Sequence, residues 1–236
     1  MSKLAGFDRL SPNGCFKNKE ADSIGSIIGV YMGQPTRICF VRHGETDWNL
    51  EQRMQGHRDL PLNALGEGQA KAVGRYFSGR DLAAIYSSDL QRALQTAAPI
   101  AQALNLPVIP LPALRERCLG RCEGLTFSEI SVCYEDDARA MVSRDPDYVT
   151  PGGGESRRAH EQRVVACIDD LLRRHPGESL VVVTHSQVMD VVYRRAQCLP
   201  LGVRREPPIP NGAVNWVSFD KDRWVIDLWG SGAHLF

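Results

Sequence analysis

The 236-residue sequence lacks an excess of charge of either sign, because 28 Lys and Arg residues balance 28 Asp and Glu residues. A neutral chain does not favour a surface for nucleic acid or an anionic membrane. The sequence also lacks an apolar run of the ~18 residues that a membrane span needs. Its apolar stretch 24–32 is interrupted by glycine and follows acidic residues, which does not fit a secretory signal. We therefore expect a cytoplasmic protein that binds neither nucleic acid nor membrane.

Cysteine pairs of the kind that bind zinc are missing as well. The seven cysteines are scattered, and Cys118 and Cys122 have no second Cys or His pair to complete a site. We interpret the cysteines as buried or free thiols and expect no metal site. An odd cysteine count without a signal peptide fits a reducing compartment.

The chain that remains has ordinary globular composition, 43% hydrophobic, without internal repeats or low-complexity blocks. Its length suits one full α/β domain. Residues 1–35 contain Gly and Pro and show no periodic pattern, so we interpret them as a partly disordered N-terminal extension. Residues 36–236 are expected to form the domain.

One short apolar strand, residues 37–41, ends in a polar loop that begins with Arg42, His43 and Gly44. In an open α/β sheet, ligands bind at the carboxyl ends of the strands. Arg42 can bind a planar-faced anion through two hydrogen bonds, and His43 is a nucleophile or general base near neutral pH. We expect Gly44 to let the backbone approach a ligand closely.

Apolar runs and helix signals predict the other elements. The stretch 179–183 is continuously apolar, as in a strand buried on both faces. Ser88 and Gln91 predict a capping box for a helix that continues to about residue 104. Further strands are expected at 84–87, 107–110, 213–219 and 224–229, and further helices at 66–77, 127–142, 156–174 and 187–197.

Four side chains are expected to meet at one edge of the sheet. Arg42 and His43 end the first strand, Arg92 falls in the first turn of a helix, and His185 follows a later strand. Two arginines and two histidines around one point would bind a tetrahedral anion, with support from helix N-terminal amides after Ser88 and His185. Each residue alone could be an ion-pair partner or a packed histidine, but their combination favours a catalytic site.

The run Arg42-His43-Gly44-Glu45-Thr46, with Trp48-Asn49 after it, resembles the signature of the histidine phosphatase superfamily, phosphoglycerate mutase-like branch. Segments 87–97 and 153–156 resemble other parts of that family, and the similarity extends from residue 37 to residue 229. The resemblance implies an α/β fold, a three-layer α/β/α sandwich with a mostly parallel central sheet.

In the mechanism that the resemblance implies, His43 attacks phosphorus and forms a phosphohistidine, while a backbone carbonyl holds its other ring nitrogen. Arg42, Arg92 and His185 neutralise the transferring group. Glu116 protonates the leaving oxygen and then deprotonates the attacking water. The resemblance implies no metal and no cofactor. It assigns phosphate or substrate contacts to Arg42, Asn49, Arg92, His185, Ser186, Gln55 and Gly56.

Some assignments stay open. Glu45 and Glu123 are nearby carboxylates that compete with Glu116 for the role of the acid, and His57 is interpreted as a rim residue. The family usually carries Gly where this chain has Ser186, and often Trp where it has Cys122. We expect the second difference to reshape the side of the site that receives the leaving group.

The sequence therefore predicts a metal-independent phosphatase for a small phosphorylated metabolite. One alternative is a phosphoglycerate mutase primed by 2,3-bisphosphoglycerate. Arg117 beside Glu116 suits it, but segment 123–155 lacks a basic cluster for the substrate carboxylate, since Arg139 and Arg144 are its only basic residues. A second alternative is a phospholigand-binding protein without catalysis. The individual substrate and a homodimeric state stay open.

Overall fold

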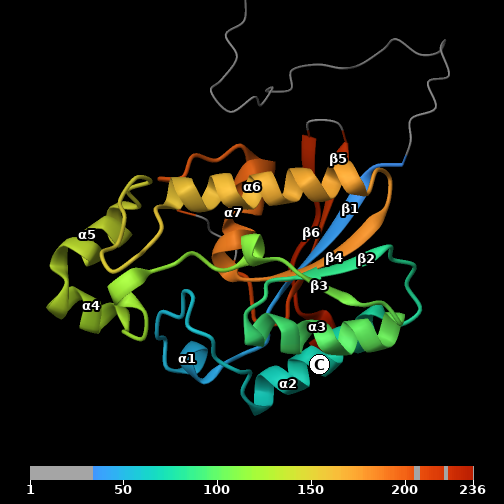
Figure 1. The fold of residues 1–236 in the computed structure, drawn as a ribbon, viewed down its shortest axis with the longest axis horizontal. Coiled ribbons are helices and arrows are strands. Elements are labelled where there is room, and N and C mark those ends of the chain that lie inside the picture. Colours follow the sequence, from blue (N-terminus) through green and yellow to red (C-terminus); the bar gives the residue numbers. More distant parts are fainter. Residues whose placement is uncertain (1–33, 205–207, 221–222, 236) are drawn as a thin grey trace, which may run out of the picture. The chain divides into compact units, whose positions relative to one another are not determined.

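The structure of the chain is a computed structural model that describes residues 34–204, 208–220 and 223–235 (Figure 1). The predicted extension, residues 1–35, lies outside the described residues apart from Gln34 and Pro35. All helices and strands expected from the sequence fall within the described part.

Six strands form one sheet in the order β3-β2-β4-β1-β5-β6. The first four of these pair in parallel, and β5 runs antiparallel to both of its neighbours. The mostly parallel central sheet expected from the sequence is therefore confirmed. The bounds of the strands are Thr36–Arg42 for β1, Ala84–Ser87 for β2, Val108–Pro110 for β3, Ser179–Thr184 for β4, Val214–Asp220 for β5 and Arg223–Ser231 for β6.

Helices cover both faces of this sheet (Figure 1). Helices α2 (Ala64–Phe77) and α3 (Gln91–Leu104) lie on one face, and α6 (Arg157–Arg174) and α7 (Ser186–Gln197) lie on the other. This is the three-layer α/β/α sandwich that the sequence predicts. Shorter elements are helix α1 (Asp47–Leu50) and single 3₁₀ turns at Pro112–Leu114, Gly120–Cys122 and Ala233–Leu235.

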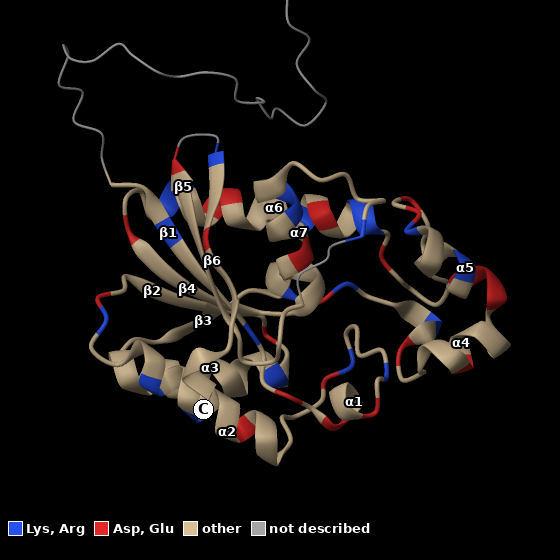
Figure 2. Cartoon of the chain, turned by 180° about the vertical axis from the view of Figure 1, so that it is seen from behind, with Lys and Arg blue, Asp and Glu red and all other residues tan. Residues whose placement is uncertain are grey.

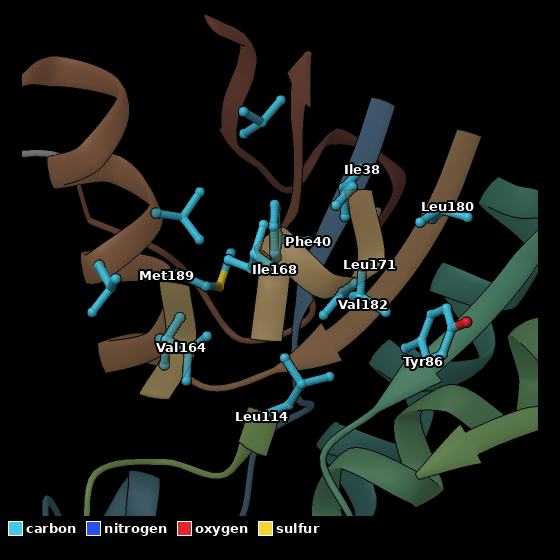
Figure 3. Packing of buried hydrophobic residues seen from close by; sticks show 14 of the residues in the cluster. Ile38, Phe40, Tyr86, Leu114, Val164, Ile168, Leu171, Leu180, Val182 and Met189 are labelled. Carbon is cyan, nitrogen blue, oxygen red and sulfur yellow. The ribbon is translucent and has the colours of Figure 1, made fainter. Parts of the chain in front are cut away.

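Two hydrophobic clusters hold the layers together, because successive residues of a strand point to opposite faces of the sheet. On one face, Phe40 of β1 belongs to a buried cluster with Ile168 of α6 and Met189 of α7 (Figure 3). On the other face, Val41 belongs to a cluster with Phe77 of α2. Burial on both faces explains why β1 and β4 are continuously apolar.

A small cap formed by α4 (Phe127–Cys133) and α5 (Glu135–Ser143) lies beside the sandwich (Figure 1). The single helix predicted over 127–142 is wrong, because the helix breaks at Tyr134, whose φ is −142° and ψ is 67°. A second helix starts directly after Tyr134 with three acidic residues in its first turn. Carboxylates at this end of a helix interact favourably with the helix dipole. Cys122 is buried in a cluster with Leu119, Ile130 and Ala138, and its expected effect on the leaving-group side stays a prediction.

The start of α3 also differs from the prediction. Leu90 rather than Ser88 is the N-cap, and no side chain caps this helix. The Gln91 amide instead donates to Asp59 Oδ1 at 2.6 Å. We expected the backbone amides after Ser88 to support a bound anion. One of them, the Gln91 amide, already donates to the Asp59 carboxylate.

Basic and acidic segments are interspersed along the chain in the view of Figure 2. This distribution agrees with the balanced composition. Within the described stretches, no helix is both long and apolar enough to cross a membrane.

Helix α2 offers a test of how closely the two helices on one face must approach. A Cβ atom added at Gly74 would lie 2.8 Å from the Pro99 carbonyl oxygen of α3, whereas one added at Gly68 meets nothing within 4 Å. We expect Gly74→Ala to lower the free energy of unfolding by ~1–3 kcal/mol through overpacking. The matched Gly68→Ala should raise it by ~0.5–1 kcal/mol. Urea unfolding of both variants measures this, and equal effects would contradict the close packing.

Candidate active site

Strands β1 and β4 carry two histidines to the same edge of the sheet. Arg42 pairs in register with Thr184, and the next residues, His43 and His185, leave the sheet together. The His43 amide donates to the Thr184 carbonyl at 2.9 Å, and the two imidazole centroids lie 5.1 Å apart. The sequence predicted this meeting.

His43 is held in one tautomer by its own loop. Its Nδ1 lies 2.7 Å from the Gly44 carbonyl oxygen, which can only accept, so Nδ1 carries the proton and the Nε2 lone pair stays available. Burial, with Arg92 and Arg42 nearby, moves the His43 pKa well below its ordinary value. The ring is therefore neutral at neutral pH.

Two arginines, the fully buried Arg92 and the partly buried Arg42, stand beside His43 and donate to backbone carbonyl oxygens. Arg92 donates to the carbonyls of Arg58 at 2.7 Å and Gly56 at 2.9 Å, and Arg42 donates to the carbonyl of Ile209 at 2.5 Å. Burial lowers the Arg92 pKa to about 10, which still leaves the guanidinium charged at neutral pH. These carbonyl oxygens help to fix the position of both side chains.

His185 is buried behind this pair. Both of its ring nitrogens lack a hydrogen-bond partner within the described residues, and so does Arg92 Nε. Burial together with Arg92, His43 and Arg42 moves the His185 pKa well below its ordinary value. Buried polar atoms without partners are costly, and here they surround the place where we expect an anion.

A cavity of about 120 Å³, the phosphate cavity, opens at this edge of the sheet. It brings together all of the predicted site residues except His185, which is buried behind it. Its lining consists of Arg42, His43, Asn49, Arg53, Met54, Gln55, Gly56, Arg92, Glu116, Leu119, Ser186 and Gln187.

Glu116 is the carboxylate that faces the phosphate cavity. Its Oε1 accepts from the Arg117 amide at 2.9 Å, and its Oε2 accepts from Ser186 Oγ at 3.2 Å and from the Gln187 amide at 3.3 Å. Ser186, which replaces the glycine usual in the family, thus binds the carboxylate rather than leaving space for the backbone.

The two competing carboxylates are engaged elsewhere. Glu45 accepts from the Asn63 side chain at 3.0 Å, and Glu123 accepts from the amides of His57 and Leu119 at 2.9 and 3.0 Å. Neither lines the phosphate cavity. The geometry therefore favours Glu116 over both as the acid.

Asn49 and Gly44 make structural contacts that the sequence did not predict. The Asn49 Oδ1 accepts from Thr46 in the capping box of α1, which leaves its side-chain amide N–H groups as the donors to a ligand. A Cβ atom at Gly44 would lie 2.6 Å from the Gly66 carbonyl oxygen. Gly44 is therefore needed for the close contact with α2, and the ligand approach that we expected of it stays a prediction.

Several supporting residues were missed from the sequence. Asn211 donates to the His43 carbonyl at 3.0 Å. His57 Nε2 lies 2.8 Å from the Glu116 carbonyl oxygen, so this residue, which we interpreted as a rim residue, also contacts the backbone of Glu116. Arg163 of α6 donates to the carbonyls of Ala113, at 2.8 Å, and Glu116, at 3.4 Å. These contacts join parts of the chain too far apart in sequence for a local signal.

Within the part of the chain that the structure describes, no group of three or more His, Cys, Asp and Glu side chains is placed to hold a metal ion. Cys118 and Cys122 do not form such a group. The positive charge that faces the phosphate cavity comes from guanidinium groups.

Comparison with known proteins assigns the family. The family model of the histidine phosphatase superfamily (branch 1) matches residues 38–232. The chain belongs to this superfamily. It is 40% identical over 201 residues to phosphoglycerate mutase-like protein 4 of Arabidopsis thaliana, a match that covers 84% of this chain and 86% of that protein.

Two further relatives support the assignment. A metal-independent phosphoserine phosphatase of Arabidopsis thaliana is 36% identical over 203 residues, covering 85% of this chain and 83% of its own. The solved structure of YhfR from Bacillus stearothermophilus superposes with a TM-score of 0.78 at 32% identity, covering 85% of this chain and all of YhfR. The fold and the family predicted from the sequence are both confirmed, and they fit phosphomonoester hydrolysis.

Buried neutral histidines make the stability of the fold depend on pH. Burial moves the pKa of His43, His160 and His185 well below the ordinary value. Near pH ~6.5 and below, the unfolded chain therefore binds more protons than the folded one, so the free energy of unfolding falls as pH falls. We expect each such histidine to lower the free energy of unfolding by up to ~1.4 kcal/mol per pH unit.

Chemical unfolding between about pH 7.5 and about pH 5.5, where most carboxylates stay ionised, measures this slope. His160→Leu should reduce the slope by one group while leaving His43 and His185 in place. Inorganic phosphate should also reduce it, because a bound anion favours protonated imidazoles. If neither His160→Leu nor inorganic phosphate changes the slope, buried neutral histidines are not its cause.

Proposed function

We propose that this chain hydrolyses a small phosphomonoester through a phosphohistidine formed on His43. The observation that carries the proposal is the fixed tautomer of His43, whose ring lines a cavity together with the guanidinium groups of Arg42 and Arg92. Such a site is suited to bind the phosphoryl group and to stabilise the charge that develops on its oxygens.

In the first step, the Nε2 lone pair of His43 attacks phosphorus, and the bond from phosphorus to the ester oxygen breaks. Arg42, Arg92 and His185 surround the equatorial oxygens, and Asn49 donates a further hydrogen bond. Glu116 delivers its proton to the leaving oxygen, which departs as an alcohol. The hydrogen bond from Nδ1 of His43 to the Gly44 carbonyl stabilises the positive imidazole that forms.

In the second step, water attacks the phosphohistidine. Glu116, now a carboxylate, takes a proton from the water, and the bond from phosphorus to Nε2 breaks to release inorganic phosphate. The hydrogen bonds from Ser186 and the Gln187 amide to Glu116 Oε2 hold the carboxylate at the cavity in both steps. Gln55 and Gly56 line the same cavity, and Gly56 contributes through its carbonyl bond to Arg92.

A mutase remains a second candidate because of one specific observation. Segment 123–155 contributes only Arg144 to the lining of a second cavity, but Arg117 and Arg157, which come from outside that segment, line the same cavity. Such a cluster suits the carboxylate of phosphoglycerate. A mutase would retain the phosphoryl group on His43 and return it to another hydroxyl rather than to water.

Variants of His43 and Glu116 test the mechanism. His43→Ala should lower kcat/KM by roughly three orders of magnitude or more for every substrate, with a chelator present. Glu116→Gln should lower kcat/KM for glycerol 3-phosphate by about 10²–10⁴-fold. Its effect on p-nitrophenyl phosphate should be much smaller, because p-nitrophenolate leaves without a proton. A burst of p-nitrophenol should then appear, because hydrolysis of the phosphohistidine still needs the base.

Glu67→Gln, which removes an exposed carboxylate from α2, is the matched control. It should leave kcat/KM unchanged for both substrates. Equal losses for both esters in Glu116→Gln would rule out its role as the acid. Isomerisation of 3-phosphoglycerate upon addition of 2,3-bisphosphoglycerate would favour the mutase. Phosphate binding without any turnover would indicate the non-catalytic alternative.

A further inference from the structure

The chain makes a tight turn just before β5. The Ala213 amide donates to the Pro210 carbonyl at 3.1 Å, and Gly212 has a φ of 72°. A turn that closes in this way requires a residue that tolerates positive φ at its third position, which favours glycine. Asn211 precedes this glycine, so the turn determines where its side chain starts.

Backbone contacts fasten the turn to the strand that carries the nucleophile. The Gly212 amide donates to the carbonyls of Arg42 at 3.1 Å and His43 at 3.3 Å. From the other side, His234 Nε2 lies 3.0 Å from the Gly212 carbonyl oxygen, which can only accept. The turn is thus held between the end of β1 and the 3₁₀ turn that contains His234.

The side-chain amide of Asn211 meets three oxygens. Its Nδ2 atom lies 3.0 Å from the His43 carbonyl oxygen, 3.3 Å from the Gly44 carbonyl oxygen and 3.2 Å from Asn49 Oδ1. None of these oxygens can donate, so only the nitrogen of the Asn211 amide fits this place. The surroundings of Asn211 therefore fix the orientation of its amide.

Asn49 Oδ1 is the acceptor that Asn211 shares with Thr46. The Thr46 amide donates to this oxygen at 3.2 Å, and the Thr46 hydroxyl donates to it at 3.1 Å. Because a backbone amide cannot accept, Asn49 presents its oxygen, and not its nitrogen, to Thr46 and Asn211. The N–H groups of Asn49 lie at the other end of the planar amide, and Asn49 lines the phosphate cavity.

The reversed orientation of the Asn49 amide would be unfavourable at both of its ends. Its N–H groups would face the N–H groups of Thr46 and Asn211, and its oxygen would face the oxygens of a bound phosphoryl group. The Thr46 hydroxyl can donate or accept, so it does not decide between the two orientations. Asn49 is only partly buried, and the donor from Asn211 adds to the preference for the orientation that a phosphoryl group needs.

We propose that Asn211 is a positioning residue that fixes the side-chain amide of Asn49 with its N–H groups toward the phosphoryl oxygens. Asn211 does not line the phosphate cavity, so it acts through Asn49 and not on the substrate. This inference rests on the proposed function, because it is there that Asn49 binds the transferring group. The Asn211 nitrogen also contacts the Gly44 carbonyl, which accepts from His43 Nδ1. One side chain thus holds the nucleophile and Asn49 in a fixed relation to each other.

A double-mutant cycle on kcat/KM for p-nitrophenyl phosphate tests this role. Asn49→Ala should lower kcat/KM by about 10²-fold, because it removes a donor to the transferring group. Asn211→Ala should lower it by about 10-fold. In the Asn49→Ala background, Asn211→Ala should cost no more than about threefold, since the amide that it positions is gone. If the two losses multiply instead, Asn211 acts independently of Asn49, and the inference is wrong although hydrolysis stands.

Asn105→Ala is the matched control for lost stability. It makes the same change at the C-cap of α3, where Asn105 has a φ of 53°, and Asn tolerates such a φ better than Ala does. This variant should unfold at a lower urea concentration than the natural chain and keep kcat/KM within about twofold. If Asn105→Ala loses as much activity as Asn211→Ala at an equal loss of stability, the effect of Asn211 is one of stability and the inference falls.

Binding of inorganic phosphate separates this inference from the proposed function. Calorimetric titration repeats the cycle without turnover, and Asn49→Ala and Asn211→Ala should each weaken binding about 10-fold. The double variant should match Asn49→Ala within about threefold, and additive losses would overturn the positioning role. A natural chain that neither binds phosphate nor hydrolyses the ester would overturn the proposed function, and this inference with it.

Nitrogen-15 NMR of the natural chain gives a test that needs no variant of Asn211. The side-chain N–H signals that are missing from Asn49→Ala belong to Asn49. They should shift when inorganic phosphate is added, because a new acceptor reaches these N–H groups. If phosphate binds and these signals stay in place, the amide of Asn49 does not face the phosphoryl oxygens, and Asn211 does not position it for them.

Discussion

The site depends on positive charge held at the carboxyl edge of the sheet. The guanidinium of Arg92 is fully buried and donates to the carbonyls of Arg58 and Gly56, and Arg42 beside it donates to the carbonyl of Ile209. Removing a guanidinium from water costs several kcal/mol when no anion accompanies it. The fold must offset that cost elsewhere, and the burial of apolar side chains on both faces of the sheet contributes to this. In the proposed mechanism, an incoming phosphoryl dianion reduces the cost, so the charge that destabilises the site also favours binding of the substrate.

This charge also sets the chemistry of the histidines. A guanidinium beside an imidazole disfavours its protonation, and burial acts in the same direction. His43 is therefore neutral before a substrate arrives, as the proposed attack on phosphorus requires. Once the dianion lies among the arginines, the balance reverses, and the positive imidazole of the phosphohistidine becomes tolerable. One arrangement of charges thus serves both the attack and the intermediate.

The sequence predicted those parts of the site that follow from local patterns. The apolar strands, the arginine and histidine at the end of β1, and Arg92 in the first turn of α3 are all visible in the order of the residues. The contacts of Asn211 with the His43 carbonyl and of Arg163 with the Glu116 carbonyl are not, because their partners lie far away along the chain. The break at Tyr134 was also hidden, because both halves of segment 127–142 have helical patterns.

The second cavity shows the same limit. Arg117, Arg144 and Arg157 are scattered in the sequence, and only the fold brings them to the lining of one cavity. Glu116 lines the phosphate cavity, whereas its neighbour Arg117 lines the second cavity. Because Met54, Leu119, Ser186 and Gln187 line both, the two cavities adjoin. A motif that identifies Glu116 therefore reveals one of these cavities, and the other depends on contacts between segments that lie far apart in the sequence.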